Sequence, residues 1–517
     1  MPRAVGEPEA RLRGGWGDML DVRSELGARP LLDISPAREP AAEHPVAAPV
    51  LVVDLDGTVL KTDLLWESLL ALLKQEPLCL FLFPLWLLKG KAYLKEQIAR
   101  RVELDVSVLP YRSDFLDYLK EQRDQGRLIA LATGADVGQA RQVAEYLKIF
   151  DWVFASDGIT NLAGESKRNR LVNVFGEKAF DYAGNGRSDL RVWSSARKAI
   201  VVAASPLVRW RAARVAQVDR VFEQPGRGLL DYLKPLRLQH WLKNILVFAP
   251  LLAAHRADEI ALSGKLLPAF LAFGCFASCG YLLNDLFDLA ADRHHPHKRL
   301  RPFAAGDLPV SYALLMIPVL VCLGCIIGTL VSPLFLGVAL IYLASSLAYS
   351  FYLKRVVILD VIVLAGLYTM RIIAGSAAVG IWPSHWLLAF STFVFFSLAL
   401  VKRYSELVIM RKVDGDGAKA RAYEVNDEEL LAAMGTASGY LAVLVLALYI
   451  NSGTAVALYA RSELMWFLCP LLFYWISHVW LIAHRGKMPD DPVVFATRDR
   501  TSQILALLML ASTLVAL

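Results

Sequence analysis

The stretch Asn284-Asp285-Leu286-Phe287-Asp288-Leu289-Ala290-Ala291-Asp292-Arg293-His294-His295-Pro296-His297-Lys298-Arg299-Leu300-Arg301-Pro302 begins where one apolar segment ends and stops just before the next. Asn284, Asp288 and Asp292 are spaced i, i+4 and i+8, so a helix places their side chains on one face. Asp285 lies about 100° round the same helix. Carboxylates at this spacing suit Mg²⁺, a hard cation that shares its coordination sphere with substrate phosphates.

A cluster of cations follows the acidic face at once. Arg293, Lys298 and Arg301 lie within ten residues of Asp292. Beside a metal-bound diphosphate, such cations would hold phosphate oxygens. The whole stretch therefore predicts a diphosphate site at a membrane surface.

The composition agrees with a membrane protein. Of the 517 residues, 56% are apolar, and the mean hydropathy of the chain is +0.42. The formal net charge of +6 is modest, and no basic stripe is interleaved with aromatic residues as nucleic-acid binding requires. The partners we expect are therefore the bilayer and small substrates, with no nucleic acid.

The apolar residues are unevenly distributed, which predicts a multi-domain chain. We expect a tail over 1–47, a soluble α/β domain over 48–205 with a helical cap insert at about 62–125, a linker over 206–232, and an all-α membrane domain over 233–517. The membrane domain has about nine candidate spans of roughly the length that crosses a bilayer. These spans are 241–257, 265–283, 310–331, 333–352, 356–379, 385–401, 433–452, 463–483 and 502–517. The short first span could instead lie in the membrane interface.

Loop charge predicts the topology. Basic residues fall in the loops after the second, fourth, sixth and eighth spans, and the intervening loops carry little positive charge. By the positive-inside rule, the basic loops are cytoplasmic. We therefore expect a multi-pass protein of a bacterial-type inner (plasma) membrane, with the soluble domain and the aspartate-rich stretch on the cytoplasmic side and Leu517 on the far side.

The soluble half contains four polar signals that follow apolar strands or lie in polar loops. Val50-Leu-Val-Val-Asp54-Leu-Asp56-Gly57-Thr58 is a buried-type strand that ends in two carboxylates. Leu128–Gly134 is a second apolar strand, which ends in the hydroxyl of Thr133. Lys167 lies in a polar loop, and Phe180–Asp189 is a further strand with polar residues at its end. Strand ends of this kind are where α/β folds place ligands.

In this order, the four signals resemble the haloacid dehalogenase (HAD) phosphatase superfamily over residues 48–205. The resemblance implies that Asp54 is a nucleophile and Asp56 a general acid/base. It also implies that Thr133 and Lys167 hold the phosphoryl group, and that Asp189 joins Asp54 and Asp56 in binding Mg²⁺. A carboxylate nucleophile splits ester hydrolysis into two steps, and Mg²⁺ neutralises the transferring group. One departure is Asn185, which stands where many members have a first Asp.

The cap insert contains Leu78-Cys-Leu-Phe-Leu-Phe-Pro-Leu-Trp-Leu-Leu88, which is too short to span a membrane and is interrupted by Pro84. Two interpretations are open. The commoner one is a buried helix of the cap. The alternative is a surface that leans on the bilayer and admits a lipid-linked phosphate.

The aspartate-rich stretch among about nine spans resembles the UbiA superfamily of intramembrane transferases. Asn284, Asp285, Asp288 and Asp292 match the first of that superfamily's two aspartate-rich motifs. The resemblance implies that Asp285, Asp288 and Asp292 bind Mg²⁺ and that the latter two hold it on a pyrophosphate. The place of the second motif instead reads Leu400-Val-Lys402-Arg403-Tyr404-Ser-Glu406, which favours an additional anionic substrate group over a second metal site.

The tail of the first motif, together with Tyr349–Lys354 and Arg371-Ile-Ile-Ala-Gly375, is similar to the UbiA branch that makes decaprenyl-phosphate 5-phosphoribose. Phosphoribosyl diphosphate and a polyprenyl phosphate together bring a pyrophosphate, a 5-phosphate and a lipid phosphate. Arg371 lies inside an apolar span, where an unpaired cation is costly, so we interpret it as an anion ligand. Asp360 could bind ribose hydroxyls or cap its span. Candidates for the phosphates are Lys298, Arg301, Lys354, Lys402 and Arg403.

The pairing of the two halves leads to our main hypothesis. A phosphoribosyl-lipid still carries a 5-phosphate, and a phosphatase domain on the same membrane face could remove it. We therefore expect a bifunctional Mg²⁺-dependent enzyme, possible as a homo-oligomer, that makes a polyprenyl-phosphate ribose. Two alternatives are an ordinary UbiA prenyltransferase that uses an allylic diphosphate, and a membrane-anchored phosphatase whose helices only bind lipid or a partner.

Overall fold

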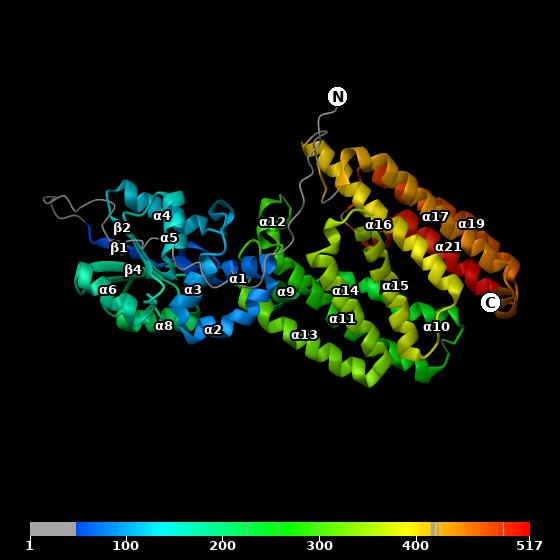
Figure 1. Cartoon of the computed structure of the whole chain (residues 1–517), viewed down its shortest axis with the longest axis horizontal. Helices are drawn as coiled ribbons and strands as arrows, with labels where there is room; N and C mark the ends of the chain where they lie inside the picture. The colour runs from blue at the N-terminus through cyan, green and yellow to red at the C-terminus, as the bar shows by residue number, and fades with distance from the viewer. Residues whose placement is uncertain are drawn as a thin grey trace, which may run out of the picture.

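A computed structural model describes residues 48–517, except 225, 257, 296, 415–418, 421–422 and 490. A soluble α/β domain lies at one end of the molecule and a helical domain at the other (Figure 1). The predicted fold class, a soluble α/β domain joined to an all-α membrane domain, is confirmed.

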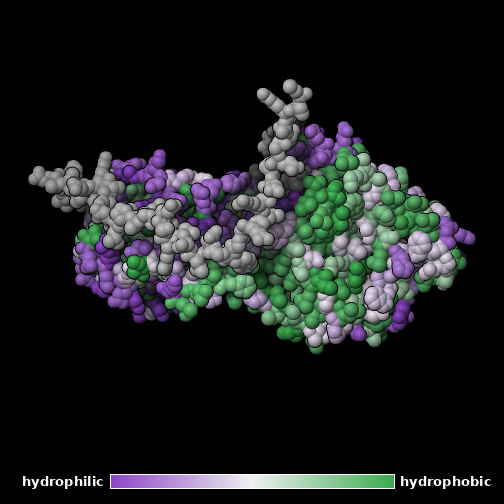
Figure 2. Space-filling model, viewed as in Figure 1, coloured by the Kyte–Doolittle hydropathy of each residue, from purple (hydrophilic) through white to green (hydrophobic). Residues whose placement is uncertain are grey.

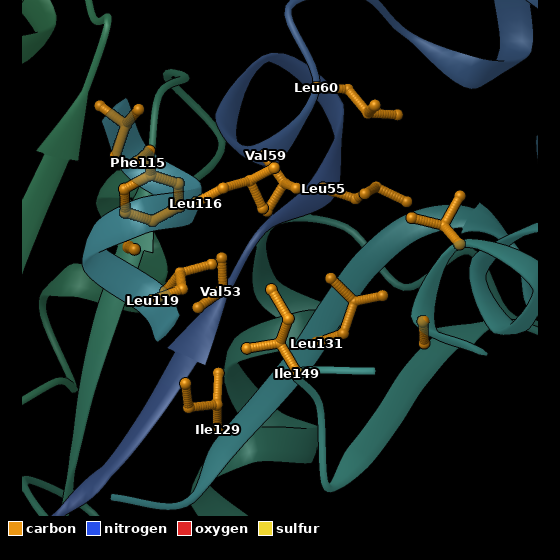
Figure 3. Close-up of a cluster of buried hydrophobic side chains, with 14 of the residues drawn as sticks. Val53, Leu55, Val59, Leu60, Phe115, Leu116, Leu119, Ile129, Leu131 and Ile149 are labelled. Carbon is orange, nitrogen blue, oxygen red and sulfur yellow. The ribbon is translucent and has the colours of Figure 1, made fainter. Parts of the chain in front are cut away.

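The soluble domain is built on one parallel sheet of order β3-β2-β1-β4-β5-β6. Leu51 and Val53 of β1 face one buried cluster, and Val52 faces another on the opposite side of the sheet. This alternation covers both faces, as in doubly wound folds. Figure 3 shows the first cluster, with Val53 beside Leu119, Ile129 and Leu131. The strands are β1 (Val50–Val53), β2 (Ile129–Asp136), β3 (Trp152–Ser156), β4 (Phe180–Gly184), β5 (Lys198–Val202) and β6 (Gln217–Phe222).

The sheet extends past the expected domain boundary at residue 205. Strand β6 pairs in parallel with β5, and the helix between them, α8 (Pro206–Val215), covers the sheet. We therefore place the end of this domain after Phe222, because residues 206–222 supply a strand and its crossover helix. The remaining helices of the domain and its cap are α1 (Leu64–Gln75), α2 (Phe83–Leu88), α3 (Lys91–Ala99), α4 (Ser113–Asp124), α5 (Val137–Leu147), α6 (Glu165–Phe175) and α7 (Leu190–Trp193).

The interpretation of Leu78–Leu88 as a buried helix is wrong. The segment forms a 3₁₀ turn, η2 (Pro77–Leu82), followed by α2, and most of its apolar side chains are exposed. Only Cys79 and Trp86 are buried in this segment. Pro84 sits at the start of α2, where its missing N–H costs nothing, so it divides the segment into two short pieces.

Within the described residues, seven helices are long and apolar enough to cross a membrane. They correspond to the expected spans from the second to the eighth. Residues 241–257 instead form the 3₁₀ segment η5 (Leu238–Phe248) and the short α10 (Ala249–Ala253), and the last span is the 17-residue α21 (Arg500–Ala516). The long helices are α11 (Ile260–Phe287), α13 (Val310–Val331), α14 (Pro333–Phe351), α15 (Leu359–Val379), α16 (His385–Asp414), α17 (Glu428–Ile450) and α19 (Leu468–His484).

Short elements connect these spans. They are α9 (Leu229–Leu233), α12 (Leu289–His294), α18 (Gly453–Leu458), α20 (Pro492–Arg498) and the two-stranded pair β7 (Lys419–Ala420) and β8 (Tyr423–Glu424). Figure 2 shows hydrophobic residues spread over the helical domain, whereas hydrophilic residues dominate the soluble domain. This distribution is the one expected of a helical bundle in a bilayer with a water-exposed domain attached.

The irregular segment η5 packs closely on α15 at Gly375. A Cβ atom at this position would lie 2.0 Å from the carbonyl oxygen of Val247, so only glycine allows the two backbones to approach. We predict that Gly375→Ala destabilises the protein by about 1–3 kcal/mol through overpacking. Thermal unfolding in detergent would measure the loss.

Gly366 on the same helix provides the matched control, because nothing lies within 4 Å of a Cβ added there. Gly366→Ala should therefore leave the midpoint of unfolding unchanged or slightly raise it. Equal losses from the two substitutions would show that the contact between Gly375 and Val247 is not limiting.

Two candidate catalytic sites

The first candidate site lies at the carboxyl ends of the strands β1, β2 and β4. Asp54 directly follows β1, Thr133 lies within β2, and Asp189 follows β4. Because parallel strands end at the same edge of the sheet, the fold brings these side chains together. Lys167 of α6 completes the group, and its Nζ lies 2.7 Å from Oδ1 of Asp54.

A buried network joins the members of this site. Lys167 Nζ lies 3.9 Å from Oδ1 of Asp189 and donates to the hydroxyl of Tyr182, which in turn donates to Asp189 at 2.8 Å. The other oxygen of Asp189 accepts the backbone N–H groups of Asn185 and Gly186. Asp54, Lys167 and Asp189 thus have fixed positions and little contact with water.

Burial controls the protonation of the two leading carboxylates. It raises the pKa of Asp54 to about 6, and the nearby Asp189 acts in the same direction, against Lys167. Burial, then Asp63 and Asp54, raise the pKa of Asp56 well above its usual value. A pKa of about 6 leaves Asp54 mainly ionised at neutral pH, whereas the stronger rise favours the protonated form of Asp56, which can donate its proton.

The chain turns sharply after Asp56. Gly57 has φ +75°, and a Cβ there would overlap the amide of Asn185. The turn points Asp56 Oδ1 at the first N–H of α1, with Leu64 N donating at 2.9 Å. The N-terminus of α1 is therefore hydrogen-bonded directly to Asp56.

The donor set of this site fits Mg²⁺. Asp54 and Asp189 present carboxylates on either side of Lys167 Nζ, and hard oxygen ligands are those that Mg²⁺ prefers. Asn185 lies beside them, at Gly57, and its neutral amide lowers the negative charge of the site. With a metal bound, these residues would neutralise a transferring phosphoryl group.

The second candidate site lies at the end of α11, where Asn284 and Asp285 occupy the last turn. Asp288 separates α11 from α12, and Asp292 lies within α12. Asp285 and Asp292 are buried, and Asn284 Oδ1 is buried without a hydrogen-bond partner among the residues that the structure describes. A buried oxygen of this kind, next to three carboxylates, can serve as a ligand to a cation, so this donor set also suits Mg²⁺.

Each carboxylate of this motif faces cations. Arg301 Nη1 lies 2.6 Å from Asp292 and 3.3 Å from Asp285, which also pairs with Arg237. Lys354 Nζ lies 2.8 Å from Asp288. Burial raises the pKa of Asp288, but Lys354 and then Lys74 outweigh it and hold that pKa below its usual value. Across the described residues, no three His, Cys, Asp or Glu side chains converge as a ready-made metal cluster.

Not every predicted cation joins this group. The guanidinium of Arg293 points to the soluble domain, where its Nη atoms donate to both carboxylate oxygens of Glu67 on α1 at 2.7 and 3.0 Å. Both side chains are only 5% exposed. Lys298 lies within electrostatic range of Asp292. The structure therefore places Arg301, Lys354 and Lys298 at the motif and Arg293 at the domain junction.

Arg371 lies deeper in the membrane domain and contacts neutral groups. It donates to Asn244 Oδ1, the Tyr342 hydroxyl and the Leu367 carbonyl at 2.7–3.1 Å. In the part of the chain that the structure describes, it makes no ion pair within 4 Å. A buried guanidinium with only neutral partners retains its positive charge and attracts an anion.

Arg403 has a different environment from that of Arg371. It is fully buried and lies 2.5 Å from Asp360 and 2.7 Å from Glu406. Tyr423 of β8 also donates to Asp360. The carboxylate of Asp360, on α15, therefore links α16 to the segment that follows it. Lys402 lies within electrostatic range of Glu406 and Arg403 first, and then of Asp491 and Lys243.

The sequence reasoning missed four residues that the structure places at or near this site: Arg237, Lys243, Asn244 and Asp491. Lys243 pairs with Asp491, Arg237 with Asp285, and Asn244 with Arg371. A signal was available, because Lys243 and Asn244 are polar residues at the start of an otherwise apolar segment. That segment was interpreted by its hydropathy alone.

Known proteins match one or both halves of the chain. A model of the UbiA prenyltransferase family matches residues 245–514. The y4nM protein of Sinorhizobium fredii is 36% identical over 90% of this chain and 91% of its own length. The decaprenyl-phosphate phosphoribosyltransferase of Mycobacterium tuberculosis is 32% identical over 57% of this chain and 96% of its own length.

Two solved structures also align with the separate halves. A UbiA homologue of Archaeoglobus fulgidus bound to GPP and Mg²⁺ covers 55% of this chain and 99% of its own, with 16% identity and a TM-score of 0.42. Phosphoserine phosphatase in its apo form covers 36% of this chain and 98% of its own, with 16% identity and a TM-score of 0.25.

The chain belongs to the UbiA prenyltransferase family and is a multi-pass membrane protein. Its membrane half is a UbiA-type transferase domain. Its soluble half has the order of motifs and the parallel sheet that the resemblance to the HAD superfamily implies.

The buried pair between Arg403 and Asp360 generates a stability prediction. Asp360→Asn leaves the guanidinium without one of its two carboxylates in a dry environment, so we expect a loss of about 3–5 kcal/mol. Thermal unfolding in detergent would measure it. Glu406→Gln is the control, because Glu406 is 29% exposed on its side chain and water can replace it. A larger loss from Glu406→Gln would contradict this assignment.

Proposed function

We propose that the protein transfers 5-phosphoribose from phosphoribosyl diphosphate to a polyprenyl phosphate, and then removes the 5-phosphate from the lipid product. The observation that carries the first step is the charge distribution of the second site. Three carboxylates of one motif face Arg237, Arg301 and Lys354, while Arg371 keeps its charge among neutral groups. Such a site suits a substrate pair with several separate anionic groups.

The cations outnumber what an allylic diphosphate requires. A prenyl donor carries one pyrophosphate, whereas phosphoribosyl diphosphate and a lipid phosphate carry three anionic groups in total. Lys243 and Lys402 add positive charge beside Asp491, in the region where other members of the superfamily would have a second acidic motif. The 32% identity to a decaprenyl-phosphate phosphoribosyltransferase over 96% of that relative supports the same choice.

In the proposed transfer, Asn284, Asp288 and Asp292 would hold Mg²⁺, and the metal would neutralise the negative charge of the pyrophosphate leaving group. An oxygen of the lipid phosphate attacks C1 of the ribose, the C1–O bond to pyrophosphate breaks, and the pair of electrons leaves with pyrophosphate. Arg301 and Lys354 then bind phosphate oxygens in place of carboxylates. Positioning and charge stabilisation suffice for this step.

In the proposed hydrolysis, Asp54 attacks the phosphorus of the 5-phosphate and forms an aspartyl-phosphate. Asp56, whose pKa is raised by burial and by Asp63 and Asp54, gives its proton to the departing ribose oxygen. A water molecule then attacks the phosphorus as Asp56 accepts its proton, the bond between phosphorus and Asp54 breaks, and inorganic phosphate is released. Lys167 and Thr133 hold the phosphoryl oxygens during both steps.

The helix α1 connects the two sites. Its N-terminus donates a hydrogen bond to Asp56, and Glu67 in its first turn binds Arg293 of the aspartate-rich stretch. Lys74 in its last turn donates to the Phe287 carbonyl at 2.7 Å. Lys74 also lies 3.4 Å from Asp288. Both sites therefore lie on the same side of the membrane domain, which we propose to be the cytoplasmic face of a bacterial-type inner membrane.

The first test of this proposal uses purified full-length protein, Mg²⁺, polyprenyl phosphate and ribose-labelled phosphoribosyl diphosphate. The parent should form ribosyl-lipid. Asp54→Asn should accumulate phosphoribosyl-lipid, because only the nucleophile of the second step is lost. Asp288→Asn should form no labelled lipid, since its metal ligand is lost, and removal of Mg²⁺ by EDTA should do the same. Thin-layer separation of the labelled lipids measures all four.

Two other outcomes would contradict the proposal. If neither the parent nor Asp54→Asn yields labelled lipid, and the parent consumes an allylic diphosphate instead, the protein is an ordinary prenyltransferase. If Asp54→Asn yields ribosyl-lipid at the rate of the parent, the soluble domain acts on some other phosphomonoester.

The domain junction provides a separate prediction. Glu67→Gln removes the only carboxylate within 4 Å of the buried Arg293 among the described residues, and an unpaired buried charge is strongly destabilising. We expect the soluble domain to detach from α12, which a limited proteolysis rate can report, together with a lower rate of phosphoribosyl transfer. The charge exchange Glu67→Arg with Arg293→Glu should restore part of both.

Asp307→Asn is the matched control at the same junction. Asp307 is 62% exposed on its side chain and lies 3.7 Å from Lys61, a geometry that contributes little to stability. Equal effects of Glu67→Gln and Asp307→Asn would show that the buried pair does not hold the domains together.

A further inference from the structure

The cap segment Pro77–Leu88 exposes an apolar surface that the two catalytic sites do not use. Its outward side chains Leu78, Phe81 and Leu88 are 76%, 76% and 84% exposed, and Leu85 is 58% exposed. Adjacent exposed side chains of this size form a patch that water-soluble domains rarely carry. Cys79 and Trp86 are turned inward and attach the segment to the cap.

This segment lies level with the end of a membrane-spanning helix. Lys74 Nζ donates to the carbonyl of Phe287, the last residue of α11. Residue 77 follows only three positions later, so η2 begins beside the membrane surface that α11 defines. In Figure 2 the hydrophobic surface of the helical domain continues toward the part of the soluble domain that Figure 1 labels α2.

A second apolar element lies near the membrane end of α13. Leu229 and Leu230 of α9 are 75% and 74% exposed. The hydroxyl of Tyr312, in the first turn of α13, donates to the carbonyl of Tyr232 in the same short helix. Two short elements with outward leucines thus flank the cytoplasmic ends of α11 and α13.

Cations border the apolar surface on the side of the cap. Lys89 and Lys91 directly follow α2 and are exposed, and Lys89 lies 5.0 Å from the ring of Tyr93. The guanidinium of Arg101 stacks over Trp86 at 4.8 Å. Apolar side chains bordered by Lys, Arg and aromatic residues are typical of helices that lie in the interface of an anionic membrane.

We propose that Pro77–Leu88 lies in the cytoplasmic leaflet, with Leu78, Phe81, Leu85 and Leu88 among the acyl chains. The bilayer is the occupant that fits, because the patch continues the membrane surface of the same chain and its border is cationic. The segment holds the cap at the depth of lipid headgroups.

The cap connects this surface to the phosphatase site. Helix α3 follows α2, and its Lys95 donates to the Gly134 carbonyl at 2.5 Å and to Asn161 Oδ1 at 3.1 Å. Gly134 directly follows Thr133 at the edge of the sheet. An embedded cap therefore presents the phosphatase site to phosphate groups at the bilayer surface. That the phosphate belongs to a lipid product rests on the proposed function.

Spin labels on the full-length protein in nanodiscs test the embedding directly. Phe81→Cys and Leu85→Cys would each be labelled in a Cys322→Ser/Cys325→Ser background, because these two native thiols are the ones not buried. We expect the labels to be relaxed by dissolved oxygen and shielded from a water-soluble nickel chelate. A label at Val174, an exposed apolar residue of α6 at the far end of the soluble domain, is the control.

Three results would overturn the proposal. Labels at 81 and 85 that are as accessible to nickel as the label at 174 place the patch in water. Line broadening between labels on two molecules, with shielding lost on dilution, assigns it to a second copy of the chain. Shielding that vanishes when residues 1–47 are deleted assigns it to that segment.

A functional measurement separates this proposal from the proposed function. Phe81→Asp with Leu85→Asp should slow hydrolysis of a lipid-borne phosphomonoester in nanodiscs by about ten-fold or more, since two apolar groups can no longer enter lipid. Hydrolysis of water-soluble para-nitrophenyl phosphate should not change. If no phosphoribosyl-lipid is ever made, the proposed function fails while the spin-label result still stands. If both substrates are hydrolysed at parental rates, the patch has no role in access to lipid phosphate.

Discussion

The structure depends on the pairing of opposite charges at the membrane end of α11. Burial limits the hydration of charged groups in this region, so each carboxylate of the aspartate-rich stretch needs a cation or a metal nearby. Asp285 pairs with Arg237 just before η5, Asp288 with Lys354 after α14, and Asp292 with Arg301 before α13. These contacts fix four separate segments of the chain around one point, and that point is where a diphosphate would bind.

The same need joins the two domains. Arg293 continues the acidic stretch, but its guanidinium is buried against Glu67 of the soluble domain. The first N–H of the α1 helix that carries Glu67 donates to Asp56 of the soluble site, and Lys74 in its last turn lies beside Asp288. One helix therefore contacts the reactive groups of both sites. This arrangement supports the proposal that the two domains act on one lipid.

Prediction from sequence was most successful where local spacing decides the outcome. The strand ends that carry Asp54 and Thr133 could be located because buried parallel strands are continuous apolar runs, and the parallel fold then brings them together. It was less successful where burial depends on distant parts of the chain. The apolar residues from Leu78 to Leu88 are compatible with a buried cap helix and with an exposed surface, and only the packing of the cap decides between the two. Arg403 is one of five cations that the sequence offers as phosphate ligands, and only the structure shows that Asp360, on another helix, pairs with it.

The sequence by itself determined the two domains, seven of the nine expected spans, and the acidic motif with its spacing, because hydropathy and helical periodicity are local properties of the chain. It also determined the order of the four phosphatase signals. Only the tertiary structure decided which cation faces which carboxylate, that Arg293 joins the domains, and that Lys243, Asn244 and Asp491 belong to the membrane site. Ion pairs between residues far apart in the chain depend on the packing of whole helices, and no local pattern encodes that packing.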